Sequence, residues 1–141
     1  MRGALNDKME DIADKDLLAL AADAMEKAYA PYSGFRVGAA LVTSEGDVFT
    51  GCNVENASYG LTQCAERVAI FKAVSSGSRQ IARIAIVSSS GAATYPCGAC
   101  LQALNEFALN TIIVLADEQG AIKTFDLTEL LPHSFGPDLL K

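Results

Sequence analysis

Three of the four cysteines fall in two short motifs, and the positions of these motifs limit how the chain can fold. The first motif is Cys64-Ala65-Glu66, and the second is Pro96-Cys97-Gly98-Ala99-Cys100. Each stands at the start of a segment whose apolar spacing predicts a helix, over 64–74 and over 96–108. For the cysteines to act together, the fold must bring two helix N-termini to one place.

The other apolar patterns predict an order of elements in which strands alternate with helices. Helices that alternate with strands pack on both faces of one sheet, and strands joined through a helix run parallel by right-handed crossovers. The predicted fold class is therefore α/β, a three-layer α/β/α sandwich with a mixed five-stranded sheet. The strands are expected over 35–43, 47–53, 81–88, 111–116 and 123–125, the first two as an antiparallel hairpin, and one further helix over 14–30.

The size and composition of the chain fit one ordinary domain. Of its 141 residues 50% are hydrophobic and 20% are charged, which supplies a packed core and excludes a disordered chain. We expect a single domain over 1–141 with an N-terminal tail over 1–13. No apolar run reaches the roughly 18 residues of a membrane span, and the N-terminus lacks the apolar core of a signal peptide. A cytoplasmic protein is the expectation.

The net charge restricts the class of partner. The formal charge is −6 at pH 7, and an acidic chain repels a phosphate backbone. A nucleic-acid polymer is therefore not an expected partner, and without a long apolar run a membrane is not expected either. A small neutral substrate is compatible with this charge.

The cysteine motifs predict a metal site. A helix N-terminus offers free N–H groups and a positive dipole end, both of which stabilise a thiolate. Zinc takes thiolate ligands tetrahedrally, and a catalytic zinc leaves its fourth position to water. Cys64, Cys97 and Cys100 would supply three ligands to one zinc per chain. Glu66 lies two positions after Cys64, beside the metal rather than on it, where a carboxylate can carry the proton of an activated water. Arg67 could offset the net negative charge of three thiolates on a dication.

A structural zinc site is the alternative reading of the same residues. It needs a fourth ligand, and Cys52 is the only further cysteine. Cys52 ends a predicted strand without a spaced partner, so a buried apolar thiol is its expected role. In this alternative Glu66 only complements the helix dipole. The combination of Cys-Ala-Glu with Pro-Cys-x-x-Cys instead favours the zinc-dependent nucleobase deaminases, of which it is typical.

The sequence resembles the small zinc-dependent cytidine deaminases of pyrimidine salvage. Beyond the zinc motifs, the blocks over 31–40, 51–60 and 130–135 are similar to further conserved blocks of that family. The resemblance implies hydrolytic deamination of cytidine and deoxycytidine to uridine and deoxyuridine, with Glu66 as the proton carrier. A deaminase of another aminated ring, such as blasticidin S, is a rival that shares both motifs. The pair Asn53-x-Glu55 favours a ribose over that rival.

The resemblance also implies roles for residues outside the zinc motifs. Asn53 and Glu55 would hold the ribose hydroxyls, although a strand-end turn also explains both. Phe35 would pack on the nucleoside, although core packing explains it equally. The family forms homotetramers with shared active sites. In this sequence the substrate would contact Ala65 from its own subunit and Ala57, Tyr59 and Phe135 from neighbouring ones.

The position after Cys100 departs from the family pattern, as do Gly34 and Gln63. Leu101 follows Cys100 where the family usually has an arginine, which would soften the charge of the thiolates. Its absence leaves Arg67 and the helix dipoles to compensate that charge. His133, the single histidine, is expected in an exposed turn.

Overall fold

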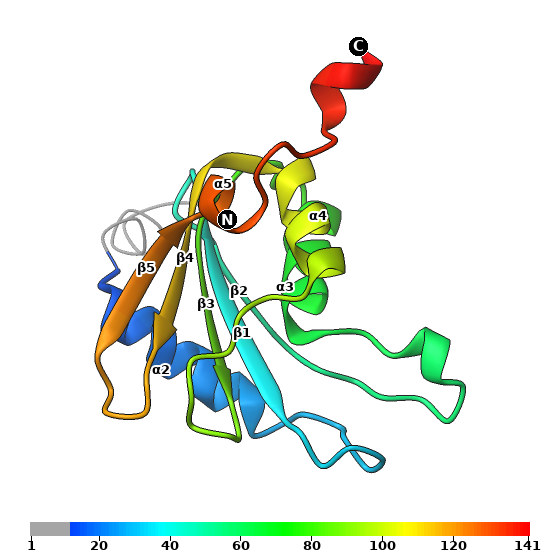
Figure 1. Cartoon of the computed structure of the whole chain (residues 1–141), viewed down its shortest axis with the longest axis vertical. Helices are drawn as coiled ribbons and strands as arrows, with labels where there is room; N and C mark the ends of the chain where they lie inside the picture. Colours follow the sequence, from blue (N-terminus) through cyan, green and yellow to red (C-terminus); the bar gives the residue numbers. More distant parts are fainter. Residues whose placement is uncertain (1–11) are drawn as a thin grey trace.

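A five-stranded sheet forms the middle of the molecule in the computed structural model, which describes residues 12–141 (Figure 1). The strand order is β2-β1-β3-β4-β5. The expected tail over 1–13 lies almost wholly outside the described residues. The strands are β1 (Val37–Thr43), β2 (Val48–Cys52), β3 (Ile81–Ser88), β4 (Ala108–Ala116) and β5 (Ile122–Asp126). The helices are α2 (Asp14–Met25), α3 (Ala65–Ser75), α4 (Gly98–Glu106) and α5 (Leu127–Leu130), with short 3₁₀ turns at η1 (Tyr59–Leu61) and η2 (Pro137–Leu140).

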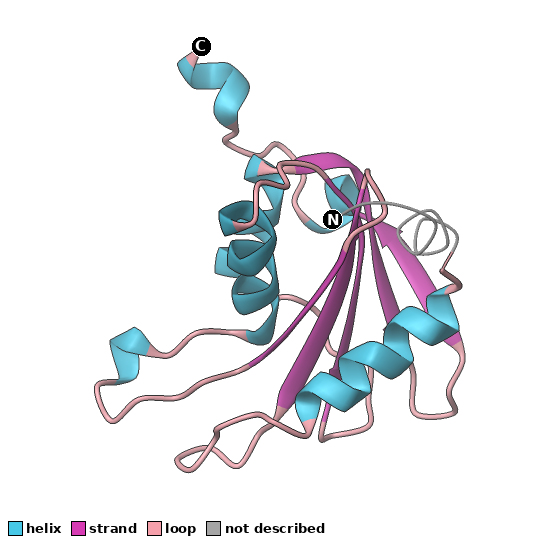
Figure 2. Ribbon diagram, turned by 180° about the vertical axis from the view of Figure 1, so that it is seen from behind, coloured by secondary structure: helices cyan, strands magenta, loops and turns pink. Residues whose placement is uncertain are grey.

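The sheet is covered on both faces, which confirms the three-layer sandwich. Every residue of β1 is buried, because alternate side chains enter two separate cores. Ala39 and Leu41 belong to the core that includes residues of α3 and α4. Ala40 and Val42 belong to the core that α2 closes. Figure 2 shows α2 on one side of the sheet and the helix pair on the other.

The strand directions follow the connections between them. β1 and β2 are joined by a tight turn and pair antiparallel, with Gly46 in that turn at φ 90°. β3 and β4 are joined through α4 and pair parallel. β2 and β3 are joined through α3 and both run antiparallel to β1, so they point the same way. The prediction that strands linked by helices are parallel is confirmed.

Two predicted helices are shorter in the structure. α2 ends at Met25 rather than at 30, because the next residues are drawn into backbone pairing with the chain after β2. There the Tyr29 N–H donates to the Asn53 carbonyl at 3.0 Å, and the Glu55 N–H donates to the Tyr29 carbonyl at 2.8 Å. α4 begins at Gly98 rather than at 96, so that Pro96 precedes the helix. Tertiary hydrogen bonding thus overrides the helical periodicity at 26–30.

The described helices are short. α2 has 12 residues and α3 has 11, so each spans less than about 20 Å, whereas a bilayer core is about 30 Å thick. Within residues 12–141 no helix has the length and apolar character that crossing a membrane requires.

Two glycines allow helices to lie directly on strands. A Cβ on Gly38 of β1 would lie 1.9 Å from the Ala21 carbonyl oxygen of α2. A Cβ on Gly51 of β2 would lie 2.6 Å from both the Ala65 carbonyl oxygen and the Ala69 nitrogen of α3. Both contacts are with backbone, which cannot rotate away. The start of α3, and with it Cys64, is therefore positioned by a glycine on the strand beneath.

We expect the substitution Gly51→Ala to lower the free energy of unfolding by about 1–3 kcal/mol, because the added methyl overpacks the contact between β2 and α3. Thermal or urea unfolding followed by circular dichroism measures this change. Gly60→Ala is the matched control, since a Cβ there meets no atom within 4 Å, and its stability should change by less than about 0.5 kcal/mol. Equal stability of the two variants would contradict the close-packing argument.

Candidate metal centre

Three chain segments converge at one end of the sheet. The register places Val37 at the start of β1 opposite Ser88 at the end of β3, and Gly38 opposite Cys52 at the end of β2. The segments before β1, after β2 and after β3 therefore leave the sheet at the same edge (Figure 1). The latter two lead into α3 and α4, which contact each other on one face of the sheet. The fold thus brings two helix N-termini together, as the cysteine motifs require.

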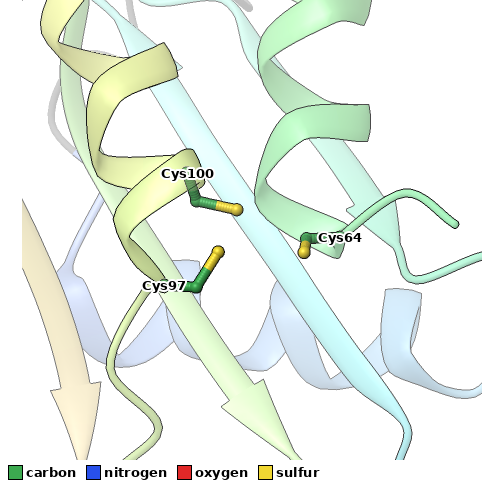
Figure 3. A group of neighbouring side chains, drawn as sticks. All are labelled: Cys64, Cys97 and Cys100. Carbon is green, nitrogen blue, oxygen red and sulfur yellow. The ribbon is translucent and has the colours of Figure 1, made fainter. Parts of the chain in front are cut away.

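The three cysteines of the two motifs lie in one cluster at these helix ends. Cys64 is the N-cap residue of α3, Cys97 is the N-cap residue of α4, and Cys100 lies in the first turn of α4. Their Sγ atoms all lie within 4.8 Å of one another, and Figure 3 shows the two sulfurs of α4 facing the third. Zinc–sulfur bonds of about 2.3 Å in a tetrahedron put sulfurs about 3.8 Å apart. The cluster therefore fits a zinc ion with small adjustments.

The charges around the cluster favour an anionic sulfur at Cys64. Its pKa is lowered to about 5 by the hydrogen bond from the Cys100 thiol and by Arg67. The same hydrogen bond, together with burial, raises the pKa of Cys100. Arg67 Nη2 donates to Cys64 Sγ at 3.2 Å. A guanidinium already bonded to one sulfur reduces the repulsion between thiolates that share a cation.

Glu66 is buried beside the cysteine cluster. It occupies the first turn of α3, directly after the fully buried Ala65, and only 5% of its surface is exposed. Burial raises its pKa, and Cys64 and Cys100 are close enough to act on that pKa as well. Its carboxylate is not part of the three-sulfur group. Glu66 therefore lies next to the cluster with its carboxyl withdrawn from bulk water.

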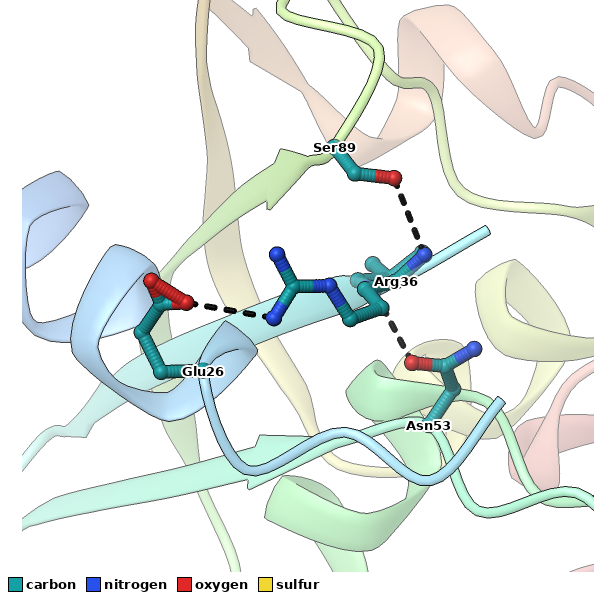
Figure 4. Close-up of polar contacts among 5 residues, drawn as sticks. Glu26, Arg36, Asn53 and Ser89 are labelled. Atoms are coloured by element: carbon teal, nitrogen blue, oxygen red, sulfur yellow. Dashed lines mark hydrogen bonds and ion pairs between the residues drawn. The ribbon is translucent and has the colours of Figure 1, made fainter. Parts of the chain in front are cut away.

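Asn53 holds the backbone on both sides of Arg36. Its Oδ1 accepts from the Val37 N–H at 2.9 Å, and its Nδ2 donates to the Phe35 carbonyl at 2.8 Å. Arg36 itself is held by Ser89 Oγ, which accepts from its N–H at 3.0 Å, and by Glu26 at 3.2 Å (Figure 4). The second N–H of this amide has no acceptor among residues 12–141 and can donate to a ligand. Asn53 thus fixes the backbone at the start of β1. It follows the last residue of β2, at the same edge of the sheet as the site.

Glu55 holds the loop that precedes Phe35. Its Oε1 accepts from the backbone N–H groups of Tyr32 and Ser33 at 2.9 and 3.2 Å, and its Oε2 accepts from the Ser33 hydroxyl. The Ser33 hydroxyl is the main cause of a pKa of Glu55 below its ordinary value. Ser33 was not singled out by the sequence, where it is one small polar residue in a turn-forming stretch.

The residues expected to act on a neighbouring subunit are all exposed. Ala57 and Tyr59 lie on the arm, residues 54–63, which extends away from the body (Figure 2), and Tyr59 is 75% exposed. The arm is closed at its base by paired hydrogen bonds of 3.0 Å between Val54 and Gln63. Phe135 is also exposed, and its segment is placed at the second half of α4 by side-chain hydrogen bonds from Gln102 and Asn105 to the Phe135 carbonyl.

The structure also shows where Cys52, Leu101 and His133 lie. Cys52 is half-buried at the end of β2 and lies outside the cysteine cluster, so the four-cysteine structural site is wrong. Leu101 is buried in the core of the α3 and α4 face, where it packs with other apolar side chains. His133 is exposed, with φ 54°, as expected of a turn residue.

Known proteins share both the sequence pattern and the fold. A curated cytidine deaminase of Halalkalibacterium halodurans is 48% identical over 120 residues, which cover 84% of this chain and 91% of that protein. The cytidine deaminase of Mycobacterium tuberculosis is 39% identical over 92% of this chain and 95% of its own. A crystal structure of cytidine deaminase from Burkholderia pseudomallei superposes with a TM-score of 0.82 at 48% identity, over 88% of this chain and all of that one.

The match to a family model covers the described sheet up to the end of β4 and includes all three clustered cysteines. This model, the cytidine and deoxycytidylate deaminase zinc-binding region, matches residues 11–116. The sulfur cluster and the family description agree on the metal, since three thiolates at two helix N-termini are a zinc donor set. The chain therefore belongs to the zinc-dependent cytidine and deoxycytidylate deaminase family.

Proposed function

We propose that this protein is a zinc-dependent cytidine deaminase that hydrolyses cytidine and deoxycytidine to uridine and deoxyuridine with release of ammonia. The observation that carries the proposal is the buried carboxyl of Glu66 next to a cluster of three cysteine sulfurs. Such a carboxyl beside a metal that activates water is what hydrolytic removal of an amine requires. The names of the curated relatives support the same substrate.

The zinc would be held by Cys64, Cys97 and Cys100, one ion per chain. When bound, it supplies water activated for attack at C4 of the pyrimidine. Arg67 would remain bonded to Cys64 and offset part of the negative charge of the three thiolates. The positive ends of α3 and α4 would add to this compensation.

Glu66 would move the protons of the reaction. One of its carboxylate oxygens takes a proton from the attacking water and gives it to N3 of the ring. A second proton then passes through the same carboxylate to the departing amine, so that the C4–N bond breaks with neutral ammonia as the leaving group. Its burial keeps bulk water from exchanging these protons.

The nucleoside would be positioned by residues from the entry to β1 and the end of β2. Glu55 would accept a hydrogen bond from a ribose hydroxyl, and Asn53 would donate its remaining N–H. Phe35, which is 42% exposed, would pack against the base. Ala65 at the start of α3 would line the pocket next to Glu66.

We expect Cys97→Ser to lower the zinc content well below one ion per chain, because it removes one of three thiolate ligands. Cys52→Ser is the matched control and should keep one zinc per chain, since Cys52 lies outside the cluster. Atomic emission on protein dialysed against metal-free buffer measures the content. Loss of zinc from the Cys52 variant alone would contradict this ligand set.

We expect the zinc-loaded protein to deplete the ultraviolet band of cytidine with release of ammonia, and cytosine and blasticidin S to react far more slowly. Glu66→Gln should keep its zinc and lose about 10²–10⁴-fold in turnover, the usual value of a positioned proton carrier. Near-normal turnover in Glu66→Gln would exclude the proton-transfer role. No reaction of the wild-type protein with any of the three compounds would exclude the proposed function.

We further propose a homotetramer whose active sites are shared between subunits. Exposed aromatic residues support this: Tyr59 projects on the arm, where its ring centroid lies 5.9 Å from that of Tyr32, and Phe135 lies toward the opposite end of α4 from Cys97. In a shared site, Ala57, Tyr59 and Phe135 would complete the pocket of a neighbouring chain.

Light scattering coupled to size exclusion should give a mass of four chains. Mixing of two inactive chains then tests whether the sites are shared. The Glu66→Gln and Phe135→Ala chains are each expected to be nearly inactive alone. They should recover activity when they are co-expressed with two different tags and purified as mixed assemblies. For random mixing, up to about a quarter of the sites should be active. Mixed assemblies without recovered activity would show that Phe135 does not act across subunits.

We also propose a cellular location and a pathway for this activity. Three thiols that must stay reduced to bind zinc suit the reducing cytoplasm, where we place the enzyme. Conversion of cytosine nucleosides to uracil nucleosides is a step of pyrimidine salvage.

A further inference from the structure

We propose that Ser33 is a positioning residue that couples the sugar-binding carboxylate of Glu55 to the backbone of Phe35. This inference rests on the proposed function, because it concerns how the nucleoside is held. It adds a residue that neither the zinc motifs nor the expected ribose ligands include.

The Ser33 hydroxyl is engaged on both sides. It donates to Glu55 Oε2 and accepts from the Phe35 N–H at 3.0 Å. A serine hydroxyl has one hydrogen to donate, so the direction of this relay is fixed by the carboxylate on one side and the N–H on the other. A change in the position of Glu55 is therefore passed to the backbone of Phe35.

The hydrogen bonds of Glu55 leave one of its oxygens for a ligand. Oε1 already accepts from two backbone N–H groups, those of Tyr32 and Ser33. Oε2 accepts only the Ser33 hydroxyl among the hydrogen bonds of the described chain, so it retains a lone pair. A ribose hydroxyl that donates to Glu55 would share Oε2 with Ser33. Ser33 thus sets the direction in which Oε2 presents its free lone pair.

The Phe35 backbone is held from its other side by the second expected ribose ligand. Its carbonyl accepts from Asn53 Nδ2, while its N–H donates to Ser33. The preceding turn is tight, with Gly34 at φ 71° and its N–H bonded to the Ala30 carbonyl at 2.9 Å. The two residues expected to bind the sugar therefore also fix the residue expected to contact the base. Sugar recognition and base placement depend on one hydrogen-bonded framework.

We expect loss of the Ser33 hydroxyl to weaken the binding of substrates that carry the ribose hydroxyls. In Ser33→Ala, Glu55 Oε2 loses its partner among the described residues, so that only the two bonds to Oε1 orient the carboxylate, and the Phe35 N–H loses its acceptor. We expect KM for cytidine to rise about tenfold or more, the usual value of a hydrogen bond to a charged group, with a smaller change in kcat. For 2′,3′-dideoxycytidine, which lacks the 2′ and 3′ hydroxyls that Glu55 would bind, KM should change less than threefold. Ser33→Thr keeps the hydroxyl and should restore KM for cytidine.

Ser44→Ala is the matched control, because Ser44 also bonds a side chain, Gln80, but lies in the turn at the other end of β1. Its kinetics should equal those of the wild type. Comparison with Glu55→Gln completes a double-mutant cycle: the effect of Ser33→Ala on KM for cytidine should largely disappear in the Glu55→Gln background.

Three outcomes would overturn the proposal. An unchanged KM for cytidine in Ser33→Ala would show that the hydrogen bonds of the Ser33 hydroxyl do not contribute to substrate binding. Equal losses for cytidine and 2′,3′-dideoxycytidine, or additive effects in the double-mutant cycle, would show a merely structural serine. In each of these cases the wild-type enzyme remains an active deaminase, and the proposed function stands. A wild-type protein inactive on cytidine would overturn both.

Discussion

Two helices pack on one face of the sheet so closely that their first turns meet. The rest of the structure depends on this constraint. Gly51 admits the backbone of α3 directly onto β2, and α4 returns from β3 to lie against α3. The N-cap positions, Cys64 and Cys97, then fall within a few ångströms of each other. Positive helix ends face the sulfurs, so the same packing that forms the core also provides part of the charge that a thiolate cluster needs.

A second framework, at the same edge of the sheet as the metal centre, holds the expected nucleoside contacts in place. The segment over 35–37 is bonded to Asn53 after β2 and to Ser89 after β3. These connections come from three segments that are distant in sequence. The edge is therefore held as a unit by tertiary hydrogen bonds rather than by the conformational preference of any one loop.

Much of the fold could be predicted from the sequence because its strands and helices have clear apolar periods. β3 was predicted at 81–88 as observed, and the cysteine motifs predicted the meeting of two helix ends. The end of α2 could not be predicted, because Tyr29 leaves the helix to pair with residues that follow β2. Ser33 could not be singled out either, since its importance depends on Glu55, 22 positions away. The roles of Tyr59 and Phe135 depend on the proposed assembly and stay predictions.

The hydrogen bonds at the base of the arm make the length of the arm independent of the geometry of the metal centre. Val54 and Gln63 are hydrogen-bonded to each other in both directions, and Val54 is also bridged to Tyr29. The residues between them form a loop whose two ends are held together by these hydrogen bonds. The second end of the loop, Gln63, directly precedes Cys64. A loop closed in this way can change length at its tip without shifting its ends, and added residues cost little further closure entropy. Insertions or deletions in the arm would thus alter how far the arm extends from the body of the chain and leave the three clustered cysteines in place.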